Sequence, residues 1–251
     1  MNFNELNLSQ ALLRAVDELG YTEMTEIQQQ SIPLLLEGRD VVGRSNTGTG
    51  KTAAFGIPAV ESITDADRKS AVVLILCPTR ELAMQANEEI RKFAKFKEGV
   101  RTSAVYGGAS MEKQIHELKR GANIVIGTPG RVMDHIRRRT LRLENIRTVI
   151  LDEADEMLNM GFREDIESIL ADVPEDRQTV LFSATMPKEI MAITDAKTDK
   201  VVTETTIYQG EDFEVVKRRV AVEEALKRAI RDKSIQVYYQ PIFDNTKGRI
   251  H

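Results

Sequence analysis

The chain has 251 residues, of which 41% are hydrophobic and 29% are charged, and its formal net charge is −4 at pH 7. This balance is ordinary for a soluble globular protein, and it argues against bulk, non-specific binding of nucleic acid while leaving a local phosphate-binding patch open. No secretory signal opens the chain and no run approaches the ~20 apolar residues of a membrane span, so no membrane partner is expected.

A helix is predicted first, over Ser9–Leu19, with Ser9 as its N-cap and Gly20 at its C-terminal end. From residue 40 to about residue 194, short runs rich in Val, Ile and Leu alternate with longer amphipathic stretches. Most of the short runs lack polar alternation, which is typical of strands buried on both faces. They are Asp40–Gly43, Ala71–Pro78, Thr102–Tyr106, Asn123–Thr128, Thr148–Asp152 and Thr179–Ser183. The amphipathic stretches, which we interpret as helices, include Arg80–Phe96, Met111–Arg120 and Arg163–Asp172.

This alternation predicts an α/β fold with a mostly parallel sheet flanked by helices on both faces. Ligands of such sheets bind beyond the carboxyl ends of the strands, and here the residues with the strongest chemical signal follow the apolar runs directly. The single cysteine, Cys77, lies in one of these runs and is expected to be a buried core residue. One cysteine excludes a disulfide framework and favours a reducing cytosol, so a cytoplasmic location is expected.

A glycine-rich loop follows the first run: residues 45–52 are Ser-Asn-Thr-Gly-Thr-Gly-Lys-Thr. Glycines let successive backbone N–H groups face one anion, and a helix predicted to begin at Lys51 adds its positive end. Lys51 is expected to reach the outer phosphates of a nucleotide and the Thr52 hydroxyl to ligate Mg²⁺, whereas the alternative is a simple Gly-rich turn. The nucleotide-binding residues predicted here are Thr47, Gly48, Thr49, Gly50, Lys51 and Thr52.

Two adjacent carboxylates, Asp152 and Glu153, end the strand predicted over Thr148–Asp152. Asp152 is expected to hold Mg²⁺ through its water shell, because this ion loses water reluctantly. Glu153 is expected to orient and deprotonate an attacking water as a general base. Together with Lys51, this pair predicts a site that binds ATP with Mg²⁺ and hydrolyses it.

Residues 152–155 read Asp-Glu-Ala-Asp, and the region from Phe3 to about Thr194 resembles the first, N-terminal RecA-like domain of DEAD-box ATP-dependent RNA helicases. The resemblance rests on several separate motifs in the family's order. It implies a RecA-like P-loop domain with ATP and Mg²⁺ as cofactors. The chain departs from the family at Ser45, where the P-loop usually begins with Ala.

Residues 20–28 resemble the family's Q motif, with Phe3 as its isolated upstream aromatic residue. The resemblance implies that Gln28 reads the adenine edge, that Phe3 stacks on the ring and that Tyr21 also belongs to the nucleotide site. A side-chain amide offers one donor and one acceptor group, which suits adenine better than guanine. Met24 stands where the family has Pro, and it is expected to loosen this loop.

Three further segments resemble the family's RNA-backbone motifs. The residues implied are Pro78, Thr79, Arg80, Gly107, Gly108, Thr128, Pro129, Gly130 and Arg131. Hydroxyls, N–H groups at helix starts, arginines and glycines suit phosphates and 2′-hydroxyls, and none offers obvious base-edge readout, so RNA binding is expected to be independent of sequence. Ser183-Ala184-Thr185 resembles the motif that links hydrolysis to RNA. Hydrogen bonds from Ser183 and Thr185 to the loop that contains Asp155 are therefore expected.

The strand and helix rhythm stops after residue 194. Thr194–Asp212 is polar and predicts no element, Phe213–Asp232 has helical spacing, and Ile235–Gln240 is a short strand-like run. We predict a RecA-like domain over residues 1–195 and a short α/β C-terminal appendage over residues 196–251. The join, within Thr194–Tyr208, is interpreted as a fusion or an assembly artefact.

The appendage resembles the opening of a bacterial EAL-type cyclic-di-GMP phosphodiesterase domain, over Val215–His251. The segments that carry this resemblance are Ala225–Ile230 and Ile235–Ile242. The sequence lacks that family's signature glutamate and other metal ligands, so no phosphodiesterase activity is implied. The histidines, His116, His135 and His251, are scattered and are predicted to lie at the surface.

DEAD-box helicases close two RecA-like domains around ATP and RNA, and the second supplies arginines worth roughly 10³–10⁵ in rate. After Thr185 we find no second strand series and no arginine-bearing helicase motif. The resemblance therefore implies ATP binding and weak RNA-stimulated hydrolysis, with unwinding dependent on a second RecA-like domain supplied elsewhere. Two alternatives stay open: a non-catalytic ATP- or RNA-binding fragment, and a signalling adaptor that acts through the EAL-like tail.

Overall fold

The computed structural model describes residues 1–45, 48–67 and 69–185, together with the backbone of residues 200–203, 207–209, 243–244 and 249–250. The helices are α1 (Gln10–Glu18), α2 (Glu26–Leu36), α3 (Lys51–Glu61), α4 (Arg80–Phe93), α5 (Met111–Lys119), α6 (Pro129–Arg137), α7 (Ala154–Asn159) and α8 (Arg163–Asp172). The strands are β1 (Val41–Arg44), β2 (Val73–Leu76), β3 (Thr102–Val105), β4 (Ile124–Gly127), β5 (Thr148–Leu151), β6 (Gln178–Ser183), β7 (Lys200–Thr203), β8 (Ile207–Gln209), β9 (Phe243–Asp244) and β10 (Arg249–Ile250).

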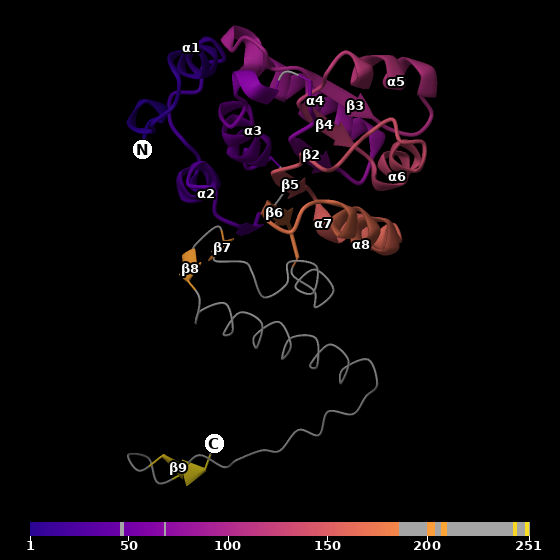
Figure 1. Ribbon diagram of the computed structural model, residues 1–251. Helices are drawn as coiled ribbons and strands as arrows, with labels where there is room; N and C mark the ends of the chain where they lie inside the picture. Colours follow the sequence, from indigo (N-terminus) through magenta and orange to yellow (C-terminus); the bar gives the residue numbers. More distant parts are fainter. Residues whose placement is uncertain are drawn as a thin grey trace.

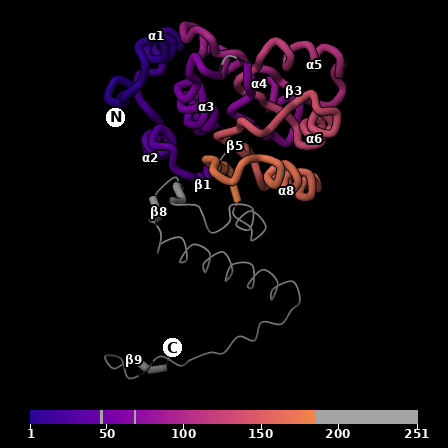
Figure 2. Tube along the Cα trace, in the orientation of Figure 1, coloured from indigo at the N-terminus to yellow at the C-terminus, as the bar shows by residue number. Residues whose placement is uncertain are grey.

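An eight-stranded sheet forms the centre of the fold, in the order β3-β4-β2-β5-β6-β1-β7-β8 (Figure 1). Every neighbouring pair from β3 to β7 is parallel, and only β8 pairs antiparallel to its neighbour β7. The six apolar runs of the sequence contain β1 to β6, so the predicted α/β class and parallel sheet are confirmed. The chain trace in Figure 2 shows α1 to α4 and α5 to α8 gathered around these strands.

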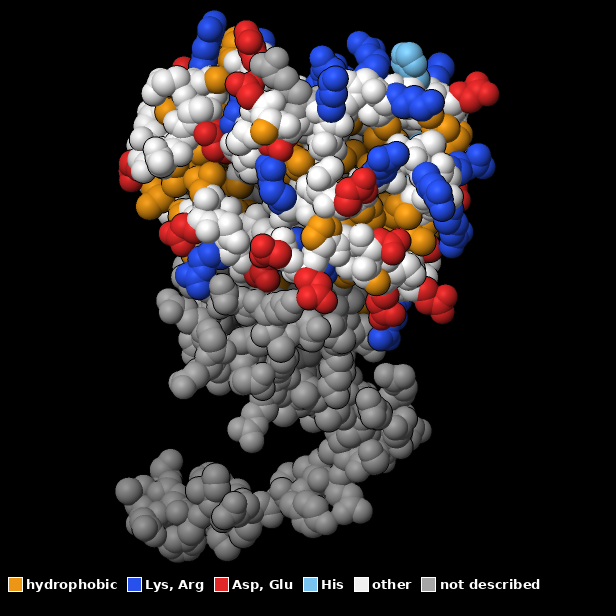
Figure 3. Space-filling view, viewed as in Figure 1, with side chains coloured by type: hydrophobic (Ala, Val, Ile, Leu, Met, Phe, Trp, Pro, Cys, Tyr) orange, Lys and Arg blue, Asp and Glu red, His pale blue; other side chains and the backbone are white. Residues whose placement is uncertain are grey.

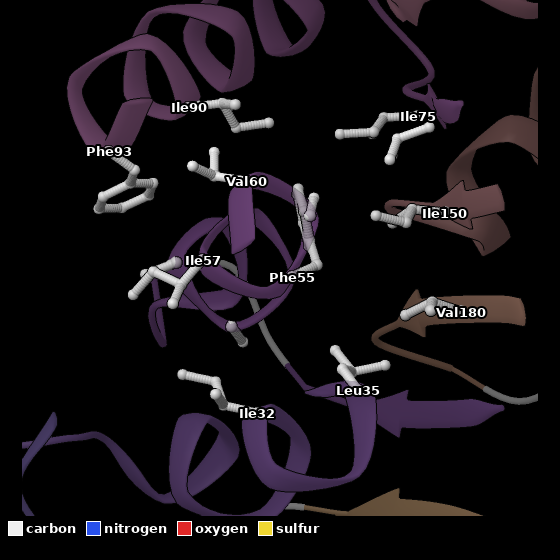
Figure 4. Close-up of a cluster of buried hydrophobic side chains, with 14 of the residues drawn as sticks. Ile32, Leu35, Phe55, Ile57, Val60, Ile75, Ile90, Phe93, Ile150 and Val180 are labelled. Carbon is white, nitrogen blue, oxygen red and sulfur yellow. The ribbon is translucent and has the colours of Figure 1, made fainter. Parts of the chain in front are cut away.

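Both faces of the central strands β2, β4 and β5 are buried almost throughout, which explains why these strands lack polar alternation. Along β2, Val73 and Ile75 pack into one hydrophobic cluster with α1 to α4, whereas Leu74 and Leu76 pack into a second cluster with α6 to α8. Figure 4 shows the first cluster, in which Phe55 of α3 lies against side chains of the sheet. Cys77 is fully buried, as the sequence predicted.

The structure differs from the sequence prediction at the start of α1. Ser9 is the N-cap residue, but its side chain does not bond to the helix backbone. Its hydroxyl instead donates to Glu61 Oε2 at 2.8 Å, and its N–H donates to Glu61 Oε1 at 3.1 Å. A carboxylate acceptor competes well for the hydroxyl because a charged partner gives the stronger hydrogen bond.

The prediction that Thr194–Asp212 contains no element is wrong. Its backbone forms β7, which pairs with β1, and β8, which pairs with β7. Without β7, the hydrogen-bonding groups on one side of β1 would lie at an open sheet edge, so a short run with β-branched residues suffices to add a strand.

Two predicted elements of the appendage, the helix over Phe213–Asp232 and the strand over Ile235–Gln240, lie outside the described residues. The segments that carry the EAL resemblance also lie there, so that resemblance stays a prediction. The backbone beyond residue 240 is described only for β9 and β10, which pair antiparallel. Across the described part of the chain, no helix has the length and apolar character required to cross a membrane.

Candidate functional site

The glycine-rich loop leaves the carboxyl end of β1 and enters α3 at Lys51. Gly48 and Gly50 have φ angles of 82° and 91°, which L side chains adopt only at a cost. A Cβ atom on Gly50 would also lie 2.4 Å from Gln28 Nε2. Both the backbone angle and the lack of space therefore require glycine at this position. Thr47 lies outside the described residues, and its predicted contact with a nucleotide stays a prediction.

Lys51 lies at the centre of the site, and its side chain is 6% exposed. Its Nζ donates to Glu153 Oε1 at 2.6 Å and to the backbone oxygen of Ser45 at 3.2 Å. The glycine-rich loop and the acidic pair therefore lie against each other, beyond the carboxyl ends of β1 and β5. A phosphate that entered here would meet Lys51 and the N–H groups at the start of α3.

Asp152 is a buried carboxylate with an unsatisfied oxygen. It is 6% exposed, and its Oδ1 has no hydrogen-bond partner among the described residues. Burial raises the pKa of Asp152 to about 7; the positive charge of Lys51 acts in the opposite direction and the negative charge of Glu153 in the same one. A buried oxygen without a donor is costly, and a cation beside it would remove that cost.

Thr52 and Asp152 fit a magnesium ion of the kind that binds together with a nucleotide. In residues 1–45, 48–67 and 69–185, no three His, Cys, Asp or Glu side chains are grouped so that they could hold a metal. Mg²⁺ commonly relies on one or two carboxylates, with waters and phosphate oxygens as its other ligands. One carboxylate, one hydroxyl and space for phosphates match that preference.

Glu153 adopts an unusual backbone conformation between β5 and α7, with φ 53° and ψ 52°. Outside glycine, left-handed angles cost free energy and cluster at functional sites. The sharp turn brings Glu153 against Lys51 while Asp152, one residue earlier, stays at the end of the strand.

Gln28 lies in the first turn of α2 and is 1% exposed. Its Oε1 accepts from the N–H of Thr25 at 3.0 Å, and its Nε2 donates to the backbone oxygen of Gly50 at 3.0 Å. The amide that the resemblance assigns to adenine thus holds the glycine-rich loop. Its contact with a base stays a prediction.

The two aromatic residues assigned to the nucleotide differ in exposure. Tyr21 is partly exposed, and its hydroxyl donates to Glu89 Oε1 at 3.1 Å; burial, together with Glu89, raises the pKa of Tyr21 to about 12. Phe3 is 3% exposed and meets the Tyr21 ring edge to face, with 6.1 Å between the ring centres. The stacking of Phe3 on a base stays a prediction, and it requires this ring to become accessible.

The expectation that Met24 loosens this loop stays a prediction. Met24 is 3% exposed, and its N–H donates to the backbone oxygen of Met1 at 3.2 Å. Proline has no N–H and could not make this bond, so methionine anchors the loop by a contact of its own.

Asp155, Ser183 and Thr185 form the hydrogen-bonded group that the sequence predicted. Asp155 Oδ2 accepts from the Thr185 N–H at 2.9 Å and from the Thr185 hydroxyl at 2.8 Å. The Ser183 hydroxyl accepts from the Asp155 N–H at 3.2 Å and donates to the Thr185 backbone oxygen at 2.7 Å. Burial alone would raise the pKa of Asp155, but the hydrogen bonds from Thr185 and Ser183 outweigh it and lower this pKa.

The glycine-rich loop connects to the same group, because the Ser45 N–H donates to the Ser183 backbone oxygen at 3.0 Å. Ser45 is 1% exposed, and its hydroxyl is hydrogen-bonded to that of Thr49. A change at the phosphate loop would therefore reach Asp155 through adjoining contacts.

The three segments assigned to RNA, residues 78–80, 107–108 and 128–131, meet at the carboxyl ends of β2, β3 and β4; we call them the RNA segments. Thr79 caps α4 by accepting from the Leu82 N–H at 3.2 Å. Arg80 is 53% exposed, and its Nη1 lies 3.5 Å from where a Cβ atom of Gly108 would be.

The third RNA segment begins where β4 ends. The Thr128 N–H donates to the Val105 backbone oxygen at 3.1 Å, which holds it next to the strand that precedes Gly107. Pro129 occupies the first turn of α6, and the Gly130 backbone is partly exposed. The Arg131 side chain is only 14% exposed. In Figure 3, Lys and Arg side chains gather over the part of the molecule where Figure 1 places α5 and α6, so a local basic surface exists despite the negative net charge.

The surface position predicted for His135 is wrong, because the side chain is fully buried, whereas His116 is exposed as predicted. The third histidine, His251, lies outside the described residues. His135 Nε2 lies 2.9 Å from Gln114 Oε1 and its Nδ1 lies 2.8 Å from the Thr140 hydroxyl. The arginines that follow His135 in sequence suggest a solvated helix face, whereas in the structure Gln114 of α5 and Thr140 both contact its ring.

Comparisons with known proteins show what this chain is similar to. A family model described as DEAD/DEAH box helicase matches residues 25–193. The DEAD-box ATP-dependent RNA helicase CshA of Streptococcus pneumoniae is 58% identical over 193 residues, which are 77% of this chain and 36% of that protein. The ATP-dependent RNA helicase CshA of Limosilactobacillus reuteri is 55% identical over 193 residues, 77% of this chain and 38% of its own length.

The chain is also similar to a solved structure. The crystal structure of a DEAD box protein from the hyperthermophile Methanococcus jannaschii matches with a TM-score of 0.75 and 46% sequence identity, over 81% of this chain and 55% of that one. The alignments with the two helicases thus span 36% and 38% of those relatives' own lengths.

Proposed function

Since the chain belongs to the DEAD/DEAH box helicase family, we propose that residues 1–195 act as an N-terminal RecA-like domain that binds ATP, Mg²⁺ and RNA, and hydrolyses ATP weakly when RNA is bound. The observation that carries this proposal is the 2.6 Å contact between Lys51 Nζ and Glu153 Oε1, beside the unpartnered Asp152 Oδ1. One cation, one buried carboxylate with an unfilled oxygen and one further carboxylate form the charge pattern that a magnesium nucleotide requires.

Lys51 and Glu153 exchange partners in this proposal. Lys51 Nζ leaves Glu153 Oε1 and binds the outer phosphate oxygens, together with the N–H groups of the loop that ends at Gly50. Glu153, freed from its ion pair, accepts a proton from the attacking water as a general base. Asp152 and Thr52 would hold a magnesium ion, and this ion would offset negative charge on the phosphates.

RNA binds in this proposal across the RNA segments. Their exposed backbone and the Arg80 guanidinium suit phosphate and 2′-hydroxyl groups, and no side chain there is arranged to read base edges. Binding is therefore independent of sequence. The group formed by Asp155, Ser183 and Thr185 couples this surface to hydrolysis, since Ser183 also contacts the phosphate loop through Ser45.

A second RecA-like domain completes the site in this proposal. Two observations support it: the longer relatives are named RNA helicases, and within the described residues Lys51 and Glu153 pair with each other rather than with an arginine. Arginines supplied in trans raise the rates of phosphoryl transfer by roughly 10³–10⁵. Hydrolysis by the chain alone is therefore slow, and unwinding requires the partner domain. A cytoplasmic location, with no membrane partner, remains a prediction from the sequence.

Hydrolysis by the purified 251-residue chain, measured with and without single-stranded RNA, tests this proposal. The parent should show slow hydrolysis that RNA stimulates, and Glu153→Gln should still bind ATP with Mg²⁺ while its rate falls to background. Glu156→Gln, an exposed position of α7, is the matched control and should behave as the parent. An equal rate in Glu153→Gln and the parent would instead favour a protein that binds without catalysis.

A further inference from the structure

We infer that Gln114 is a positioning residue for RNA. Its buried amide, which also contacts His135, holds the Gly107–Gly108 loop against α6, the helix that begins within the third RNA segment. The inference rests on the proposed function, because it concerns how the proposed RNA surface keeps its shape. Gln114 and His135 belong to none of the motifs on which that proposal stands.

Gln114 lies on α5, and it is 4% exposed. Its Nε2 donates to the backbone oxygen of Tyr106 at 3.0 Å. Its Oε1 accepts from Arg131 Nη1 at 3.2 Å and lies 2.9 Å from His135 Nε2. One amide thus joins the end of β3 to two residues of α6.

The chemistry of these partners fixes both the amide orientation and the histidine tautomer. A guanidinium only donates and a backbone oxygen only accepts, so Gln114 Oε1 must face Arg131 while Nε2 faces Tyr106. His135 Nε2, which faces the same Oε1, must then carry a proton. In the neutral ring, the bare Nδ1 faces the Thr140 hydroxyl at 2.8 Å, and the single proton of this hydroxyl is shared between Nδ1 and the backbone oxygen of His135 at 3.1 Å.

The Gly107–Gly108 loop has few anchors of its own. Both glycines are exposed, and apart from Gly107 and its two chain neighbours, no atom of the described residues lies within 4 Å of where a Cβ atom of Gly107 would be. The carbonyls on either side of the loop are the ones that Gln114 and Arg131 bind: Tyr106 O accepts from Gln114, and Ala109 O accepts from Arg131 Nη1 at 3.1 Å.

Arg131 contributes mainly to shape in this arrangement. Its Nη1 is shared between Ala109 O and Gln114 Oε1, and its Nε lies 3.7 Å from Asp134 Oδ2. The RNA phosphates are then met by backbone groups of the glycine loop and of the helix start, together with the exposed Arg80 guanidinium beside Gly108. A loop that Gln114 does not hold would not present these groups together. Fixed donors lose less entropy on binding than mobile ones, so the three hydrogen bonds of the Gln114 amide raise RNA affinity.

Two variants of the full chain separate the contacts of Gln114. Gln114→Leu removes all three hydrogen bonds at similar size. Gln114→Glu keeps the oxygen that faces Arg131 and His135 but replaces the donor to Tyr106 O, which releases the glycine loop alone. The control is Gln178→Leu, because Gln178 Nε2 also donates to two backbone oxygens, those of Leu35 and Arg39, at the amino end of β6 and far along the sheet from the RNA segments.

The affinity for a fluorescent single-stranded RNA is measured at several salt concentrations, and ATP affinity in parallel. We expect both Gln114 variants to bind RNA about tenfold more weakly, which corresponds to ~1.4 kcal/mol. The salt slope should fall by about 0.7 for each phosphate that the variant no longer neutralises. Partial unfolding alone would not alter this slope, so a smaller slope reports weaker engagement of the phosphates. Gln178→Leu should lose stability without a change in RNA affinity or slope.

Nitrogen NMR of His135 supplies a readout that needs no RNA: the ring should be the Nε2–H tautomer at pH 7 in the parent. RNA binding by the parent with unchanged affinity and slope in both Gln114 variants would overturn this inference and leave the proposed function standing. An Nδ1–H tautomer would contradict the hydrogen bond from His135 Nε2 to Gln114 Oε1, and with it the proposed arrangement of Gln114. A parent that binds no RNA would overturn the proposed function and this inference with it.

Discussion

Lys51 Nζ and Glu153 Oε1 lie 2.6 Å apart although 102 residues separate them in the sequence. This ion pair joins the segments that follow the first and the fifth strand of the chain. The Lys51 side chain is 6% exposed and the Glu153 side chain is 11% exposed, so the pair is buried. A buried pair is strongly destabilised when one partner is removed. A ligand that binds Lys51 in place of Glu153 must therefore leave Glu153 with a new hydrogen-bond partner. In the proposed exchange, phosphate binds Lys51 and the attacking water is the new partner of Glu153.

The first prediction concerns Lys51. In Lys51→Ala the phosphates lose their cation, so the Kd for ATP should rise about tenfold or more, as measured by calorimetry. Lys97→Ala is the matched control: Lys97 also pairs with a carboxylate, that of Glu61, at 3.3 Å, but away from the loop. Equal ATP affinity in Lys51→Ala and the parent would contradict the assignment of the phosphate site.

The second prediction separates backbone strain from a clash in the glycine-rich loop. Gly48→Ala places a side chain in left-handed angles with no described atom within 4 Å, so it should cost about 1–2 kcal/mol of folding free energy. Gly50→Ala carries the same strain, and its Cβ meets Gln28 Nε2 at 2.4 Å. ATP affinity should therefore fall clearly further in Gly50→Ala. Equal affinities in the two variants would show that Gln28 does not support the loop.

The third prediction concerns coupling between RNA and hydrolysis. Thr185→Val keeps the shape of the side chain but loses the hydroxyl that donates to Asp155 Oδ2 at 2.8 Å. The stimulation of ATPase by RNA should fall about tenfold to a hundredfold, in line with one hydrogen bond to a charged group, while ATP affinity stays the same. Thr148→Val, which removes a hydroxyl at the other end of the sheet, should leave stimulation intact. Full stimulation in Thr185→Val would remove this group from the mechanism.

These sites differ in how far the sequence could predict them. Lys51 and Glu153 were predictable because each belongs to a short local pattern with its own chemistry. His135 was not, because its buried ring contacts Gln114, which lies 21 residues away on another helix. β7 was missed for a similar reason, since four residues carry little periodicity and their pairing is decided by the open side of β1.

The fourth prediction is a pH dependence of stability that arises from His135. Burial, with Arg131 and Arg138, lowers its pKa below the ordinary value of 6.5, and the nearby Asp134 acts in the opposite direction. Below pH 6.5 the unfolded chain binds a proton that the folded chain resists, so the contribution of His135 is full above pH 6.5 and is lost as the pH falls towards its folded pKa. Urea unfolding at pH 8 and pH 5 should show a larger loss in the parent than in His135→Gln. An identical loss in both would contradict a neutral, buried ring.

The central claim is that the loop ending in Lys51 and Thr52 and the acidic residue Asp152 share one magnesium nucleotide. The most direct measurement is the dependence of ATP affinity on Mg²⁺ in the parent and in Asp152→Asn. Mg²⁺ should tighten ATP binding severalfold in the parent and have little effect in Asp152→Asn, because asparagine lacks the negative charge that a magnesium ion or its water shell would meet at this buried position. The same Mg²⁺ dependence in both proteins would contradict the account.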